Sequence, residues 1–182
     1  NLDVRPTDDT LGWDKDSAKG ELSKVIGQTA FIQHRLMAEA NQSLLIILQG
    51  RDASGKDGLV RHVMTGMNPA GVRVVNFKVP AGVERMHDYL WRVHASCPAR
   101  GEVGVWNRSH YEDILVPRVK NLVAEDVWRR RYRHVRDFEQ MLVDEGTTVV
   151  KFYLHVSHEV QRQRLQKRVD NPRSEEHTSE LQ

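Results

Sequence analysis

Short apolar stretches alternate along this chain with longer segments in which apolar residues recur every three or four positions. The short stretches predict buried β-strands, and the longer segments predict amphipathic α-helices. Strands are expected at residues 43–49, 72–79, 102–106 and 147–156. Helices are expected at residues 19–41, 57–67, 84–95, 125–145 and 158–169, the last one capped by Ser157.

Strands that alternate with helices are typical of a parallel sheet that is covered by helices on both faces. We therefore expect an α/β fold of three layers (αβα) with a mostly parallel sheet. The chain has 182 residues, which fits one domain with a sizeable core. This single domain is expected to span residues 17–172, after a polar leader at residues 1–16.

Residues 173–182 at the end of the chain show no pattern of core positions. Their sequence equals the translation of a common sequencing-library adapter, so we expect a non-native tail; an ordinary disordered tail is the alternative. The chain also begins with Asn1 in place of Met. Both ends are therefore expected to be incomplete.

Composition and charge narrow the range of partners and locations. The formal net charge is +2, which does not call for a nucleic-acid partner. The single cysteine, Cys97, excludes an intramolecular disulfide and fits a reducing compartment. No apolar run reaches the ~18 residues of a membrane span, and residues 1–16 lack a signal-peptide core. We therefore expect a cytoplasmic protein without membrane or nucleic-acid partners.

A glycine-bounded loop at residues 50–56 directly follows the first predicted strand and fits the G-x-x-x-x-G-K (Walker A) pattern. In such loops the backbone N–H groups point inward, the next helix presents its positive end, and a lysine reaches phosphate oxygens. This loop predicts binding of phosphoryl groups. The expected phosphate contacts come from Gly50, Arg51, Ala53, Ser54, Gly55, Lys56 and Asp57.

Two carboxylates accompany this loop. Asp57 follows Lys56 at the position where Ser or Thr is usual, and Asp52 lies inside the loop. Carboxylates repel a bound polyanion unless a divalent cation lies between them. We therefore expect Mg²⁺ at Asp52, with Asp57 as a helper; helix capping or interaction with the helix dipole explains Asp57 equally well.

Polar residues follow the third predicted strand, and catalytic groups commonly gather where parallel strands end. Arg108 is a candidate arginine finger, which would stabilise negative charge during phosphoryl transfer. The structural alternative is an ion pair of Arg108 with Glu112 or Asp113. Asn107 stands where many phosphate-loop enzymes have a metal-binding aspartate, so that role is expected to have moved to Asp52.

Several separate blocks of sequence together resemble the polyphosphate kinase 2 family, whose members transfer phosphate between inorganic polyphosphate and nucleotides. The similar blocks are residues 50–58, 68–69, 77–80, 87–92, 98–102 and 107–113. The resemblance implies a P-loop NTPase-like, nucleotide-kinase-like fold, and a homo-oligomer such as a dimer or tetramer. It also implies a C-terminal lid and helices, which are expected to be incomplete in this chain.

The resemblance also implies roles for particular residues. Asp52, Lys56 and Arg108 are the expected catalytic residues, and Arg168 is expected to close over phosphate. Lys78 and Arg92 are further candidates for phosphate contact, since Lys78 lies close to the end of a strand. The candidates for contact with the acceptor nucleotide are Asn107, His110, Tyr111, Glu112 and Asp113.

The resulting hypothesis is Mg²⁺-dependent transfer of a phosphoryl group from inorganic polyphosphate to a nucleoside mono- or diphosphate (ADP, AMP or GDP), in a reaction that can run in reverse. One alternative is an ATP-dependent small-molecule kinase with the same loop. The other is a truncated fragment that binds polyphosphate without turnover.

Overall fold

The computed structural model describes residue 7 and residues 12–171 of the chain. The predicted tail at residues 173–182 and most of the predicted leader at residues 1–16 lie outside the described residues. Helix α1 (Lys15–Glu39) begins within the last part of that predicted leader. It begins there because the Asp14 side chain caps it, accepting hydrogen bonds from the N–H groups of Asp16 and Ser17 at 2.9 Å.

The predicted strands form one parallel sheet in the order β2-β3-β1-β4. Their bounds are β1 (Ser43–Gly50), β2 (Val72–Asn76), β3 (Val103–Asn107) and β4 (Thr147–Leu154). Besides α1, the helices are α2 (Lys56–Met64), α3 (Trp91–His94), α4 (Glu112–Val119), α5 (Glu125–Asp144) and α6 (His158–Val169), with 3₁₀ turns η2 (Pro69–Gly71) and η3 (Gly82–Met86).

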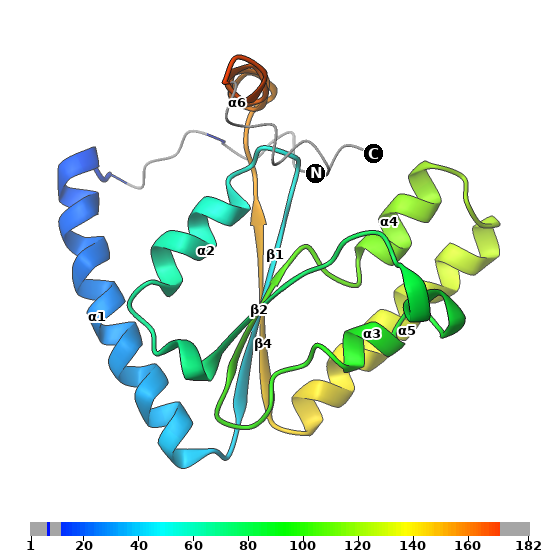
Figure 1. Cartoon of the computed structure of the whole chain (residues 1–182), viewed down its shortest axis with the longest axis horizontal. Helices are drawn as coiled ribbons and strands as arrows, with labels where there is room; N and C mark the ends of the chain where they lie inside the picture. The colour runs from blue at the N-terminus through cyan, green and yellow to red at the C-terminus, as the bar shows by residue number, and fades with distance from the viewer. Residues whose placement is uncertain (1–6, 8–11, 172–182) are drawn as a thin grey trace.

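The helices cover both faces of the sheet, which confirms the predicted three-layer fold. Figure 1 shows the sheet edge-on, with α1 and α2 on one face and α3, α4 and α5 on the other. Helix α6 lies beyond the carboxyl ends of the strands, above the connection from β1 to α2. Loops at this edge are where ligands bind in open parallel sheets.

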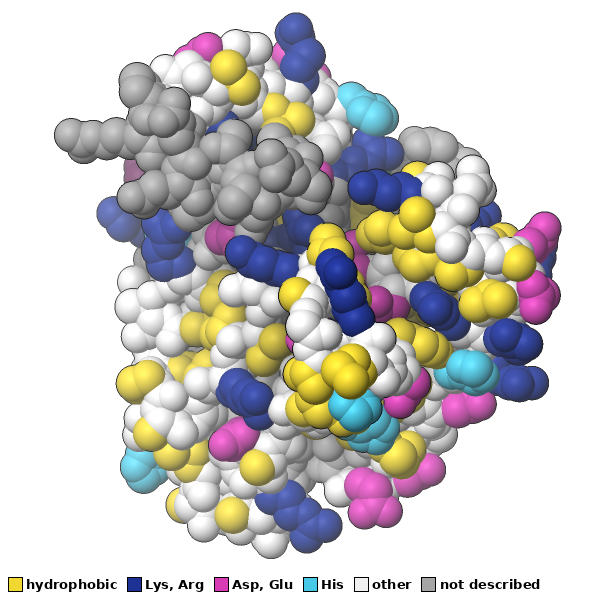
Figure 2. All heavy atoms as spheres, turned by 45° about the vertical axis from the view of Figure 1, so that its right-hand side comes forward, with side chains coloured by type: hydrophobic (Ala, Val, Ile, Leu, Met, Phe, Trp, Pro, Cys, Tyr) yellow, Lys and Arg dark blue, Asp and Glu magenta, His cyan; other side chains and the backbone are white. Residues whose placement is uncertain are grey.

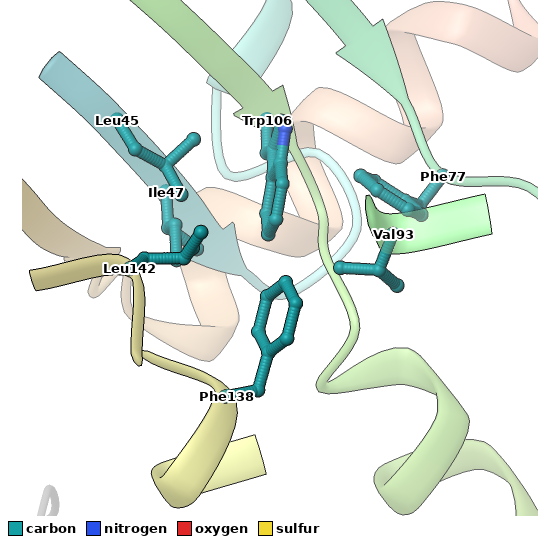
Figure 3. Close-up of a cluster of buried hydrophobic side chains, with 7 residues drawn as sticks. All are labelled: Leu45, Ile47, Phe77, Val93, Trp106, Phe138 and Leu142. Carbon is teal, nitrogen blue, oxygen red and sulfur yellow. The ribbon is translucent and has the colours of Figure 1, made fainter. Parts of the chain in front are cut away.

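Alternating side chains of β1 supply both halves of the hydrophobic core. Leu45 and Ile47 are buried in the cluster that includes Phe138 of α5, whereas Leu48 belongs to a second cluster that packs against α1 and α2. Figure 3 shows Trp106 of β3 in the middle of the first cluster. Strands buried on both faces read as continuous apolar runs, and β1 has this pattern.

Several predicted elements differ from the structure; helix α2 ends at Met64 and strand β4 at Leu154, both earlier than predicted. Strand β2 ends at Asn76, although the prediction continued it to residue 79. The single helix predicted at residues 84–95 is wrong, because the chain there forms η3 and the one-turn helix α3. Between them His87 is extended, and Asp88 accepts a hydrogen bond from the N–H of Leu90 at 2.9 Å. Such a local side-chain bond competes with helix formation.

The surface carries mixed charges. Figure 2 shows Lys and Arg side chains spread over the face that contains α3, α4 and α5, with Asp and Glu side chains between them. On α5, for example, Arg129 pairs with Glu125, and Arg130 lies 3.8 Å from Asp126. Among the described residues, no helix has the length and apolar character needed to cross a membrane.

Candidate active site

The loop between β1 and α2 has the backbone geometry that its glycines predict. Gly55 lies just before α2 with a φ of 102°, in the region that favours glycine. Gly50 is required for a different reason. A Cβ atom at that position would lie 2.9 Å from the carbonyl oxygen of Leu154 in the adjacent strand. The loop is therefore held closely against the end of β4.

Lys56 is the buried cation of this loop, with 7 % of its surface exposed. Its Nζ donates hydrogen bonds to the carbonyl oxygens of Gly50 at 2.9 Å and Arg51 at 3.2 Å. Burial lowers the pKa of Lys56, and the nearby Arg108 charge lowers it further, against the opposing effect of Asp52. The ammonium is thus fixed inside the loop, where anionic oxygens would relieve its desolvation.

Arg108 lies directly after β3 and meets the phosphate-binding loop across the sheet edge. Its Nη2 lies 2.9 Å from Oδ1 of Asp52. The backbone of Arg108 has a φ of 64°, and its N–H donates to the Leu48 carbonyl oxygen at 3.0 Å. A positive φ is unusual for arginine, so the fold fixes this residue in an uncommon conformation. The alternative ion pairs of Arg108 with Glu112 or Asp113 are wrong, because the guanidinium of Arg108 pairs with Asp52, and Asp113 pairs with Arg92.

Asn107 and Asp57 form a second link between the two loops. The Asn107 side-chain nitrogen donates to Oδ1 of Asp57 at 2.5 Å. Asn107 is 9 % exposed, and its Oδ1 has no hydrogen-bond partner among the described residues. Gly55, and not Asp57, occupies the N-cap position of α2. Asp57 lies in the first turn, where its charge also complements the helix dipole.

These two loops enclose a cleft of about 250 Å³. The predicted site residues that line it are Asp52, Ala53, Ser54, Gly55, Lys56, Asp57, Lys78, Asn107, Arg108 and Arg168. Sequence reasoning missed Asn76, Phe77 and Val79, which also line it. The available signal for them was their position at the carboxyl end of β2, at the same sheet edge as the loop.

Some predicted site residues lie outside the cleft lining. Gly50 forms the start of the loop, and the Arg51 guanidinium lies 2.8 Å from Nε2 of His158 in α6. Asp113 is buried and pairs with Arg92 at 2.9 Å. Arg92 also donates to the Lys78 carbonyl oxygen at 2.6 Å, so it holds the segment that carries Lys78.

His110 and Tyr111, predicted to contact a nucleotide, face the α5 side of the sheet instead. His110 is fully buried, and its Nε2 lies 3.5 Å from Oε1 of Glu139. The Tyr111 hydroxyl donates to the same carboxylate at 2.8 Å, and Lys151 Nζ lies 2.8 Å from its other oxygen. Glu139 and Lys151 were absent from the sequence-based candidates because they come from distant elements.

Glu112 lies close enough to the cleft to interact electrostatically with its charges. Burial raises the pKa of Glu112, whereas the charges of Arg108 and Lys56 lower it. Three acidic residues, Asp52, Asp57 and Glu112, therefore share the field of Lys56. Opposite charges in a cleft at the end of a parallel sheet suit a polyanionic ligand that carries its own cations.

Mg²⁺ fits this set of donors. It usually keeps several waters and binds through one or two carboxylates together with phosphate oxygens. The side chain of Asp52 is 53 % exposed and lines the cleft, so its carboxylate is accessible. Within the described part of the chain, no group of three or more His, Cys, Asp or Glu side chains is arranged to hold a metal. A single accessible carboxylate of this kind suits an ion that is shared with phosphate oxygens.

Comparison with other proteins gives one consistent answer. The family model described as "Polyphosphate kinase 2 (PPK2)" matches residues 12–181. The AMP/ADP-polyphosphate phosphotransferase of Meiothermus ruber is 53% identical over 167 residues, covering 91% of this chain and 62% of that protein. The ADP-polyphosphate phosphotransferase of Rhodopseudomonas palustris is 44% identical over 153 residues, covering 78% of this chain and 53% of that protein.

Solved structures agree with the sequence comparison. The crystal structure of polyphosphate kinase 2 from Arthrobacter aurescens TC1 superposes with a TM-score of 0.91 at 39% identity, covering 96% of this chain and 64% of that one. The chain thus spans less than two thirds of these relatives. The matched region includes the phosphate-binding loop, the Asn107-Arg108 turn and the cleft between them. The chain belongs to the polyphosphate kinase 2 family.

Proposed function

We propose that this chain carries the phosphoryl-transfer site of a polyphosphate-dependent nucleotide kinase. The observation that carries the proposal is the convergence of Lys56, Asp52 and Arg108 on one cleft, from loops after two adjacent strands. In this reaction a terminal phosphoryl group passes from inorganic polyphosphate to a nucleoside mono- or diphosphate. Cytoplasmic location and assembly into dimers or tetramers stay predictions of the sequence.

The residues would act by binding and charge stabilisation. Phosphoryl transfer requires in-line placement of donor and acceptor and neutralisation of the equatorial oxygens. Lys56 and the loop N–H groups would bind the transferred phosphate, and Arg108 would neutralise charge that develops in the transition state. The Asp52 carboxylate holds Arg108 at the cleft, with 2.9 Å between the charged atoms.

Mg²⁺ is the proposed metal, with Asp52 as its protein ligand. Asp52 would hold the ion at the cleft, and the chemistry supplied would be neutralisation of phosphate charge. Asp57 lines the same cleft and is the proposed helper; Oδ1 of Asp57 accepts from Asn107 and Oδ1 of Asp52 pairs with Arg108, so each carboxylate would offer its other oxygen. Lys78 and Arg168 line the same cleft and would bind further phosphate groups along the polymer.

The acceptor is proposed to be an adenine nucleotide. The relative that is 53% identical is named for AMP and ADP, and the 44% identical relative is named for ADP. Incubation of the chain with AMP or ADP and polyphosphate as sole donor should yield ADP or ATP. Product only when ATP is the donor would instead support the small-molecule kinase alternative.

The Lys56→Ala variant tests whether the loop carries the activity. Loss of its ammonium should lower kcat by about 100-fold or more, as the loss of a group that stabilises developing charge does elsewhere. Lys24→Ala is the matched control, because Lys24 lies on α1 with 66% of its side chain exposed and pairs with Glu21 at 3.8 Å. Unchanged turnover in Lys56→Ala would refute the proposal. Binding of polyphosphate without turnover by the unaltered chain would support the fragment alternative.

A further inference from the structure

The carbonyl groups of the phosphate-binding loop are held by side chains from inside the loop and from α6. Lys56 Nζ donates hydrogen bonds to the carbonyl oxygens of Gly50 and Arg51. The next three carbonyls contact α6, which follows the last strand. Gln161 Nε2 donates to the Asp52 carbonyl oxygen at 2.9 Å. Arg164 Nη1 donates to the carbonyl oxygens of Ala53 and Ser54 at 3.0 Å and 2.9 Å.

This arrangement determines where the loop N–H groups point. In a trans peptide unit the C=O of one residue and the N–H of the next residue point in opposite directions. Carbonyls held toward α6 at Asp52 and Ser54 therefore turn the N–H groups of Ala53 and Gly55 away from α6. Ala53 and Gly55 line the cleft, so anion-binding N–H groups are presented there.

We propose that Arg164 and Gln161 are positioning residues that hold the phosphate-binding loop in its anion-binding conformation. This inference rests on the proposed function, in which phosphate binds in the cleft. Neither residue lines the cleft, so neither is expected to touch the substrate. Their effect on phosphate affinity is transmitted through three loop carbonyls.

The face of α6 that contacts the loop also carries Arg168, which lines the cleft. Gln161, Arg164 and Arg168 are spaced by three and four positions, so they share one face of the helix. Arg168 lines the cleft, one turn beyond the residue that holds the loop. A Cβ atom at Gly55 would lie 3.4 Å from Arg164 Nη1, so Arg164 lies directly beside the loop backbone. Docking of α6 therefore orders the loop and places Arg168 through a single contact surface.

The test compares Arg164→Met with Arg162→Met in the full chain. Methionine keeps much of the stem and removes the donors. Arg162 is on the same helix with 79% of its side chain exposed, and it pairs with Glu159 without contacting the loop. Calorimetric titration with tripolyphosphate should show about tenfold weaker binding, or more, in Arg164→Met and no change in Arg162→Met. Arg164→Lys, which keeps a charged donor, should recover part of the affinity.

Amide hydrogen exchange supplies a readout that does not depend on phosphate binding. Exchange at residues 50–56 should become faster in Arg164→Met and remain unchanged in Arg162→Met. Equal tripolyphosphate affinity and equal exchange in the two variants would overturn the inference. An unaltered chain that bound no tripolyphosphate would remove the proposed function instead, and the exchange rates alone would then decide whether Arg164 holds the loop.

Discussion

Glu139 provides a quantitative test of the packing between α4, α5 and β4. Burial raises its pKa, but the adjacent His110 ring and the hydrogen bonds from Lys151 and Tyr111 outweigh this effect and lower the pKa from 4.5 to about 2. The side chain is only 13% exposed, so solvent screens these contacts weakly. Each tenfold change in proton affinity corresponds to ~1.4 kcal/mol, so the native state favours the carboxylate by about 3 kcal/mol.

The sign of the pH dependence follows from this lowered pKa. The contribution of Glu139 to the free energy of unfolding is complete above pH 4.5 and is lost as the pH falls toward 2. Glu139→Gln should therefore lower the free energy of unfolding by up to about 3 kcal/mol at pH 7 and by much less at pH 2. Urea denaturation of both proteins over this pH range measures the difference.

Glu125→Gln is the matched control for this experiment. Glu125 is also on α5 and pairs with Arg129, but its side chain is 64% exposed. Exposed pairs of this kind contribute about 0.5 kcal/mol or less. The reasoning would be refuted if Glu139→Gln destabilised the protein equally at pH 2 and pH 7, because the loss would then come from packing and not from ionisation.

Two further predictions concern buried side chains. Trp106→Ala should lower the free energy of unfolding by about 3–5 kcal/mol, because this side chain is fully buried between Phe77 and the cluster that includes Phe138 of α5. A loss below about 1 kcal/mol in urea denaturation would contradict this expectation. Burial raises the pKa of Cys97 to about 11. At pH 8 a disulfide reagent should therefore modify this thiol about 100-fold more slowly in the folded chain than in urea. Equal rates of modification would contradict the burial of Cys97.

Much of the fold was accessible from local sequence pattern. The apolar runs at β1 and β3 predicted buried parallel strands, because these two central strands are covered by helices on both faces. The run at β4 also predicted a strand, although β4 lies at the sheet edge with Phe152 and Tyr153 exposed. The loop before α2 was predicted from glycine and lysine spacing, which directly constrains the backbone. The helix predicted at residues 84–95 is wrong because helical periodicity does not take local side-chain contacts into account. These contacts are the hydrogen bond from the Leu90 N–H to Asp88 and the stacking of His87 on Trp91, with 4.3 Å between ring centroids.

The residues that line the cleft and the residues that support them differ in how they can be found. Arg108 directly follows β3, and Lys56 ends the loop that follows β1, so the order of these adjacent strands brings both residues to one edge. Glu139 and Arg164 support these loops from sites far away in sequence, and nothing in their own neighbourhood distinguishes them from solvent-exposed charges. Arg162 and Arg164 illustrate the difference, because two positions along one helix separate a surface ion pair from a contact with the phosphate-binding loop. Supporting residues of this kind therefore require the tertiary structure.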